Sequence, residues 1–195
     1  TKAFESAYDG EVVLRENFTK NDKDFQAQLT KIKNADFDVL YLPGYYEEAG
    51  LIIKQAREMG IEQPILGADG FGDEKMIQLA GAENVSNVFY TGHFSALAPA
   101  NDTVQPFIDA FKEKYGKEPS TFNALAYDAM FMIKSAIESQ DSADSAAITK
   151  GLAELKDFVG ITGNITMDAN HNPEKSAVVI GFTDGKESSA DTVNP

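Results

Sequence analysis

The segment Gly67-Ala-Asp-Gly-Phe-Gly72 carries a side chain that could bind a charged small molecule. It follows a predicted strand and precedes a predicted helix, but its glycine order departs from the Gly-x-Gly-x-x-Gly of phosphate loops, and Asp69 would oppose a phosphate. A carboxylate at the carboxyl end of a parallel strand suits an ammonium group, which it binds through charge-assisted hydrogen bonds. The alternative is that Asp69 only caps the following helix.

A second segment, Pro43-Gly44-Tyr45-Tyr46, ends the preceding predicted strand in the same manner. Two tyrosines at a strand-to-helix turn offer an apolar wall and hydroxyl donors, which suits the packing of a ligand. Tyr45 is the stronger candidate and Tyr46 the weaker one. Packing in the core is the competing interpretation for each of them.

Motifs of catalysis and metal binding are absent from the sequence. It contains no Gly-x-Ser-x-Gly elbow, no Gly-x-x-x-x-Gly-Lys-Ser/Thr loop and no His-Glu-x-x-His. His93 and His171 lie in predicted loops without a nucleophile to activate. The segment from Asp168 to Glu174 resembles a calcium loop only in part, because Pro173 stands where that loop needs glycine, so a turn is the better interpretation. We therefore expect no enzyme activity, no cofactor and no metal site.

The overall charge narrows the possible partners. The 195 residues include 17 basic and 31 acidic side chains, for a net charge of −14. Such a chain repels phosphate backbones and anionic lipid surfaces, so we expect no nucleic-acid partner. No apolar run approaches the roughly 20 residues of a membrane helix. The first residues read like the interior of a helix, which indicates a fragment of a longer protein.

Strand and helix patterns alternate in the first half of the chain, which predicts a parallel sheet with crossover helices. After residue 91, helical patterns dominate, and the polar end is expected to be frayed. The predicted strands are 11–18, 37–42, 64–67, 85–90, 161–167 and 176–182. The predicted helices are 24–32 (capped by Asp24), 47–59, 74–79, 104–115, 122–137 and 145–155.

The order of these motifs resembles one known family. Tyr41-Leu-Pro-Gly-Tyr-Tyr-Glu-Glu-Ala-Gly50, Lys54-Gln-Ala-Arg-Glu-Met-Gly60 and Gly67-Ala-Asp-Gly70 are similar, in order and spacing, to the Leu/Ile/Val-binding proteins of ABC importers. The resemblance implies an incomplete type I periplasmic-binding-protein fold, a three-layer α/β/α sandwich with a parallel sheet. It also implies that residues 1–94 and 177–195 form the C-terminal lobe without its first strand, and that residues 95–176 belong to the N-terminal lobe.

The same resemblance implies a function. The family captures branched-chain or similar amino acids by clamshell closure outside the cytoplasm, either in the periplasm or lipid-anchored at the cell surface, and delivers them to an ABC permease. Tyr45 would line the pocket, and Asp69 would bind the α-ammonium group of the ligand. The alternative function is the sensing domain of an amide- or amino-acid-responsive regulator. Without the other lobe, the apolar stripes of residues 95–176 (Phe107, Phe111, Leu125 and Ile133) would be exposed, so we expect the fragment to self-associate.

Overall fold

The computed structural model describes residues 2–194 and shows a mixed α/β protein. The chain divides into two compact units. Unit 1 comprises residues 2–91 and 180–189, and unit 2 comprises residues 92–179 and 190–194. Within residues 2–194, no helix is long and apolar enough to cross a membrane.

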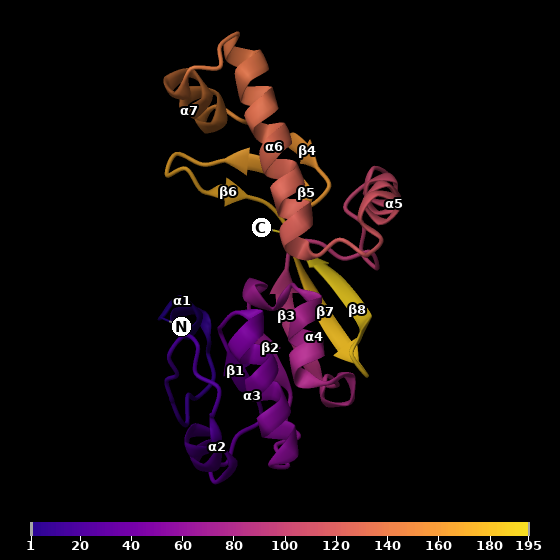
Figure 1. The fold of residues 1–195 in the computed structure, drawn as a ribbon. Helices are drawn as coiled ribbons and strands as arrows, with labels where there is room; N and C mark the ends of the chain where they lie inside the picture. Colours follow the sequence, from indigo (N-terminus) through magenta and orange to yellow (C-terminus); the bar gives the residue numbers. More distant parts are fainter. Residues whose placement is uncertain (1, 195) are drawn as a thin grey trace. The chain divides into compact units, whose positions relative to one another are not determined.

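Unit 1 is built on the larger part of a five-stranded sheet of order β1-β2-β3-β7-β8 (Figure 1), of which residues 177–179 and 190–193 fall in unit 2. Its strands are β1 (Leu40–Leu42), β2 (Ile65–Gly67), β3 (Val88–Gly92), β7 (Ala177–Thr183) and β8 (Lys186–Val193). The pairs β1–β2 and β2–β3 are parallel, as the alternating pattern predicted. Two further pairs, β3–β7 and β7–β8, complete the sheet. Strands β7 and β8 are joined by only two residues and must therefore be antiparallel, so the sheet is mixed.

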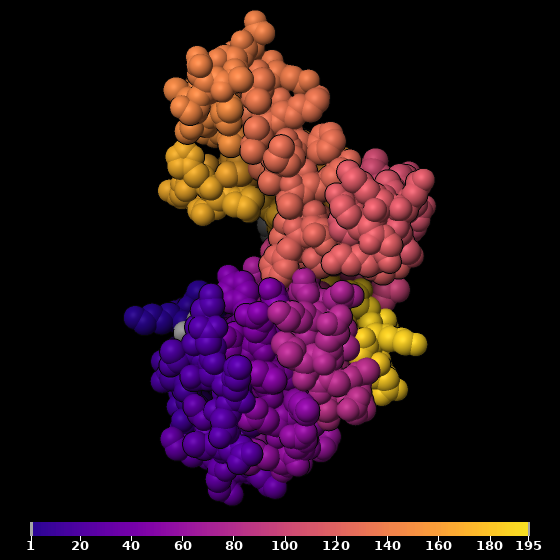
Figure 2. Space-filling model, in the orientation of Figure 1, coloured from indigo at the N-terminus to yellow at the C-terminus, as the bar shows by residue number. Residues whose placement is uncertain are grey.

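Helices α3 (Tyr46–Glu58) and α4 (Glu74–Ala80) cover one face of this sheet, and their atoms form a continuous surface (Figures 1 and 2). The apolar stripe of α3 is buried, with Ile53 and Ala56 both at 0% exposure. The other helical elements of unit 1 are α1 (Lys2–Ala7), α2 (Gln26–Lys33) and the short turns η1 (Asp69–Phe71) and η2 (Ala82–Asn84). The N-cap residue of α2 is Phe25 and not the predicted Asp24, which lies one position earlier and accepts a hydrogen bond from the Gln26 backbone amide at 3.0 Å.

The predicted strand over residues 11–18 is wrong. This segment belongs to no sheet, and Val12 and Val13 are 51% and 50% exposed. Strand-type residues form a strand only when a neighbour accepts their backbone hydrogen bonds, and no other strand pairs with this segment in the described chain.

The predicted fraying of the polar end is also wrong, because residues 186–193 form β8. The turn before it, Asp184-Gly185, has positive φ at both residues (48° and 70°). This is the backbone of a tight hairpin turn, and Asp-Gly is a favoured sequence for it. The hairpin turn thus recruits a polar segment into the edge of the sheet.

Unit 2 contains three helices and a small antiparallel sheet of order β4-β5-β6. The helices are α5 (Val104–Tyr115), α6 (Thr121–Gln140) and α7 (Ser145–Ala153), and the strands are β4 (Phe158–Gly160), β5 (Gly163–Met167) and β6 (Pro173–Glu174). The Ser120 hydroxyl and the Asn123 side chain cap α6 reciprocally, which fixes where this helix begins.

The core of unit 2 corrects the expected exposure of its apolar residues. Phe107 is only 9% exposed, because it packs edge-on against Phe94 and in a cluster with Val104, Ile108, Ala124 and Ile161. Phe111, Leu125 and Ile133 are half-buried. The large apolar side chains exposed on α6 are instead Tyr127, Met130 and Phe131, at 40%, 65% and 43%.

Candidate ligand-binding site

The two predicted ligand-binding segments lie side by side at the carboxyl ends of neighbouring strands. β1 and β2 are parallel, with Leu42 opposite Gly67, so the turns that leave them emerge at the same edge of the sheet. Tyr45 stands three residues beyond the end of β1, and Asp69 stands two residues beyond the end of β2. The structure therefore brings Tyr45 and Asp69 onto adjacent turns.

Asp69 does not cap the following helix. The N-cap of α4 is Asp73, whose carboxylate accepts a hydrogen bond from the Lys75 amide at 3.0 Å. Asp69 opens the turn η1, and its side chain is exposed. Across residues 2–194, its carboxylate accepts no hydrogen bond and forms no ion pair. This carboxylate is available to a cationic ligand group, unlike that of Asp73.

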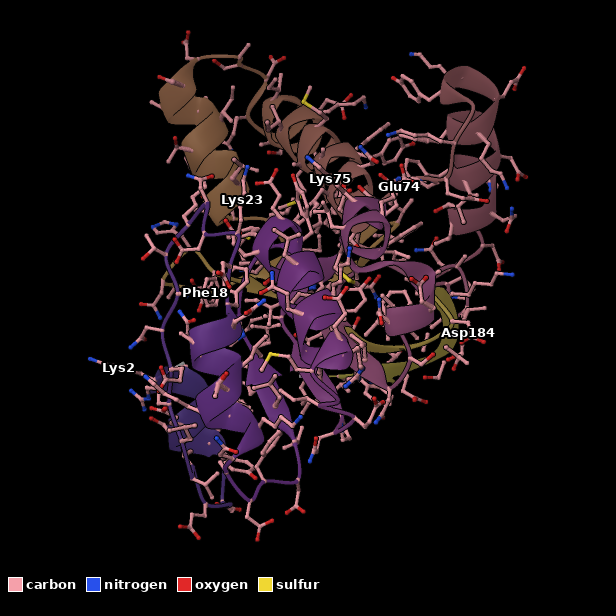
Figure 3. The ribbon with its side chains drawn as sticks, turned by 60° about the horizontal axis from the view of Figure 1, so that its bottom comes forward. Lys2, Phe18, Lys23, Glu74, Lys75 and Asp184 are labelled. Atoms are coloured by element: carbon pink, nitrogen blue, oxygen red, sulfur yellow. The ribbon has the colours of Figure 1, made fainter. Side chains whose placement is uncertain are left out.

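The two tyrosines differ in their surroundings. Tyr45 is the N-cap residue of α3 and is 66% exposed, so its ring is not part of the core. Tyr46 is half-buried, and the Lys75 ammonium lies 6.0 Å from the centre of its ring. Lys75, which is labelled in Figure 3, also forms an ion pair with Glu47 at 3.2 Å, and this pair joins α4 to α3 beside the site. The aromatic surface available to a ligand is therefore that of Tyr45 above all.

Sequence reasoning missed the residues that hold the scaffold of the site. Gln55 accepts from the Phe25 amide and donates to the Lys23 carbonyl, both at 2.8 Å. The buried carboxylate of Glu48 accepts from the Asn21 amide at 2.7 Å. Both residues attach the segment before α2 to α3. The sequence signal was the two motifs themselves, because Glu48 lies in the motif from Tyr41 to Gly50 and Gln55 in the motif from Lys54 to Gly60.

A cavity of about 510 Å³ lies in unit 2 and contains none of the three candidate residues. Its wall includes Lys175, whose ammonium lies 3.4 Å from Nδ1 of His93 and 3.3 Å from the Ser176 carbonyl. Burial lowers the pKa of Lys175, and the nearby charge of Asp128 opposes this effect. We place the candidate site at the turns after β1 and β2, because a free carboxylate and an aromatic ring come together there at a sheet edge that is a common ligand position.

The segment around Asp168 forms a turn between β5 and β6, as predicted. Oδ1 of Asp168 accepts from the amides of Asn170 (2.8 Å) and Asn172 (2.7 Å), and these bonds lower the pKa of Asp168. His171 is exposed in this turn with a positive φ of 65°. Both carboxylate oxygens of Asp168 thus accept hydrogen bonds within the turn.

Comparison with known proteins identifies similar chains. The family model described as periplasmic binding protein matches residues 1–186. A leucine-, isoleucine-, valine-, threonine- and alanine-binding protein of Pseudomonas aeruginosa is 30% identical over 157 residues, which are 80% of this chain and 41% of that protein. Leu/Ile/Val-binding protein homolog 3 of Brucella melitensis is 32% identical over 173 residues, which are 88% of this chain and 46% of that protein.

Two solved structures similar to this chain are also amino-acid-binding proteins. The branched-chain amino acid transporter substrate-binding protein LivJ of Streptococcus pneumoniae, in complex with isoleucine, is 44% identical with a TM-score of 0.92 over 100% of this chain and 55% of its own. The leucine-binding protein LivK of Thermotoga maritima is 36% identical with a TM-score of 0.84, over 91% and 51% of the two chains. This chain spans about half the length of these relatives. These findings confirm the predicted fold class, and the chain belongs to the periplasmic binding protein family.

Proposed function

We propose that this chain is part of a solute-binding protein that captures a branched-chain or similar amino acid. One observation carries the proposal: the free carboxylate of Asp69 lies on the turn next to the exposed ring of Tyr45, at the carboxyl ends of two parallel strands. In this arrangement, Asp69 binds the α-ammonium group through charge-assisted hydrogen bonds, and Tyr45 packs against the ligand. Tyr46 is a weaker candidate, because it is half-buried.

The names of the relatives support this choice of ligand. They describe binding proteins for leucine, isoleucine and valine, and one of the solved structures contains isoleucine. The resulting role is binding and not catalysis. By the same reasoning, we propose that the intact protein acts outside the cytoplasm, in the periplasm or anchored to the cell surface by lipid, and delivers its ligand to an ABC permease. Residues 95–176 then belong to the other lobe of the clamshell.

The charge of Asp69 is tested by titration with isoleucine, monitored by NMR, which detects weak binding to the 195-residue chain. Asp69→Asn removes the charge and keeps the shape. A hydrogen bond to a charged group contributes about 1.5–3 kcal/mol, so we expect the affinity to fall roughly tenfold or more. Glu74→Gln, an equal change of charge on an exposed residue of α4, is the matched control and should bind as the wild type does.

The ligand itself provides a second control. 3-Methylpentanoic acid has the carbon skeleton of isoleucine without its amino group. If Asp69 binds the ammonium group, Asp69→Asn should not weaken binding of this acid. Equal loss for both ligands, or no loss for isoleucine, would remove Asp69 from the ligand contacts.

We also propose that the chain self-associates through the exposed apolar face of α6, formed by Tyr127, Met130 and Phe131. Aromatic residues and methionine are enriched at protein interfaces, and their exposure in a monomer is unfavourable. Light scattering should give a dimer for the wild type and a monomer for Met130→Asp. Val159→Asp, a similar change at a 64% exposed position of β4, should stay dimeric, and a monomeric wild type at high concentration would contradict the proposal.

A further inference from the structure

The turn that carries Asp69 lies in direct backbone contact with the turn that carries Tyr45. Gly70 is buried between them, and a methyl group in place of its hydrogen would lie 2.3 Å from the Gly44 carbonyl oxygen and 3.1 Å from the Cα of Tyr45. Unstrained contacts between carbon and oxygen are near 3.3 Å, so the two turns could not keep this spacing with any other residue at position 70.

Each of the two turns is also supported from its other side. The ring of Phe18, a residue labelled in Figure 3, covers Gly44, and a methyl group added at Gly44 would lie 3.1 Å from Cζ of Phe18. Phe18 in turn packs edge-on against the buried Phe25. At the turn that carries Asp69, the ring of Phe71 lies against Gly67 and is only 1% exposed. The Gly44–Tyr45 backbone is therefore held between Phe18 and Gly70.

We propose that Gly70 is a positioning residue for the candidate site: its missing side chain lets the Asp69 turn rest on the Gly44–Tyr45 turn, so that the carboxylate and the tyrosine keep a fixed spacing. This inference rests on the proposed function. The obstacle to a larger residue is a backbone carbonyl group and not the end of a flexible side chain, so a substitution must move the turns apart by about 1 Å. A displacement of that size would stretch an ammonium–carboxylate hydrogen bond from about 2.8 Å to about 3.8 Å, beyond hydrogen-bonding distance, and so would lower the affinity for the ligand.

The variant Gly70→Ala tests the inference, with Gly50→Ala as the matched control. A methyl group at Gly50 would also meet backbone, 2.7 Å from the Met76 carbonyl oxygen, but at the contact between α3 and α4. Both variants should lose stability to urea. Only Gly70→Ala should shift the amide signals of Tyr45 and Asp69 strongly in the ligand-free spectrum. Phe18→Leu, which should preserve the fold, serves as a second variant. Because Phe18 supports the Gly44–Tyr45 turn on the side opposite Gly70, this variant should also shift the amide signal of Tyr45.

The ligand-free spectra and the isoleucine affinity of Gly70→Ala relative to the wild type decide the inference, whereas isoleucine binding by the wild type decides the proposed function. The wild type should show a nuclear Overhauser contact between the Hα atoms of Gly70 and Tyr45, and Gly70→Ala should weaken isoleucine binding roughly tenfold or more while Gly50→Ala binds normally. A missing contact, an unshifted Tyr45 amide or an unchanged affinity in Gly70→Ala overturns the positioning role. If the wild type shows the contact but binds no amino acid, the proposed function fails and the Gly70 contact stands as the link between the turns.

Discussion

Replacing Arg57 should loosen the sheet edge opposite the candidate site. The three shortest hydrogen bonds of its guanidinium group are donated to the carbonyls of Ile61 (2.5 Å), Gln63 (3.1 Å) and Ser86 (3.0 Å). These carbonyls belong to the segments that lead into β2 and β3, so one side chain fastens the end of α3 to both strands. Burial lowers the pKa of Arg57, and the charge of Glu62 opposes this, but an arginine so placed stays protonated at neutral pH.

The cost of losing these bonds follows from their number and surroundings. A hydrogen bond from a charged donor contributes about 1.5–3 kcal/mol, but the three bonds do not add fully, because water can replace the donor at the less buried carbonyls. The Ile61 residue is only 1% exposed, so its carbonyl is the least able to recover a partner. We expect Arg57→Met to lower the free energy of unfolding by roughly 3 kcal/mol, or the melting temperature by about 6–12 °C.

Urea denaturation followed by circular dichroism measures this loss. Arg57→Lys keeps the charge but has no planar fork, so we expect it to recover only part of the stability. Lys54→Met, on the same helix with a long and exposed side chain, is the matched control and should stay within about 0.5 kcal/mol of the wild type. An Arg57→Met variant as stable as this control would refute the role given to the three carbonyl contacts.

Two further predictions concern unit 2. The buried carboxylate of Asp128 accepts hydrogen bonds from the amides of Ile161 (2.8 Å) and Thr162 (2.9 Å) and from the Thr162 hydroxyl (2.6 Å). Asp128→Ala leaves these buried donors unpaired and should lower the free energy of unfolding, measured by urea denaturation, by about 3–5 kcal/mol. A loss below about 1 kcal/mol would contradict this role. Burial lowers the pKa of Lys175, so between the lowered value and the ordinary 10.5 the unfolded chain binds a proton that the folded chain does not. The free energy of unfolding of the wild type, relative to that of Lys175→Met, should therefore rise with pH across that window and stay constant below it. If urea denaturation gives the same pH dependence for the two proteins, the effect is excluded.

The sequence predicted the helices and the central parallel strands well, because their apolar periods are imposed by burial on one face or on both. The helix expected over 104–115 is α5, and the strand expected over 64–67 contains β2. The errors fall in segments whose structure depends on whether another strand pairs with them. Polar residues 186–193 become a strand because the Asp184-Gly185 turn folds them back beside β7.

The opposite error, at residues 11–18, has the same physical origin. Val12, Val13 and Leu14 have high strand propensity, yet propensity measures how well a side chain fits a pleated surface and supplies no hydrogen-bonding partner. Strand β1 is the terminal strand of the sheet, and no other described strand pairs with 11–18. Local sequence therefore indicates which segments can pair, while the order of strands determines which of them do.

In the candidate site, too, the local sequence indicates the residue types, while the arrangement of the strands determines their placement. The alternation of strands and helices predicts that the turns holding Tyr45 and Asp69 meet at one edge of the sheet, since parallel neighbours have their carboxyl ends together. Their spacing is a different quantity, set by the distance between β1 and β2 and by what fills the gap. Gly70 fills it with backbone alone, and no periodicity in the sequence distinguishes this glycine from one that merely permits a turn. The types of the binding residues are thus readable from the chain, whereas their mutual placement depends on a contact between two backbones that only the folded structure reveals.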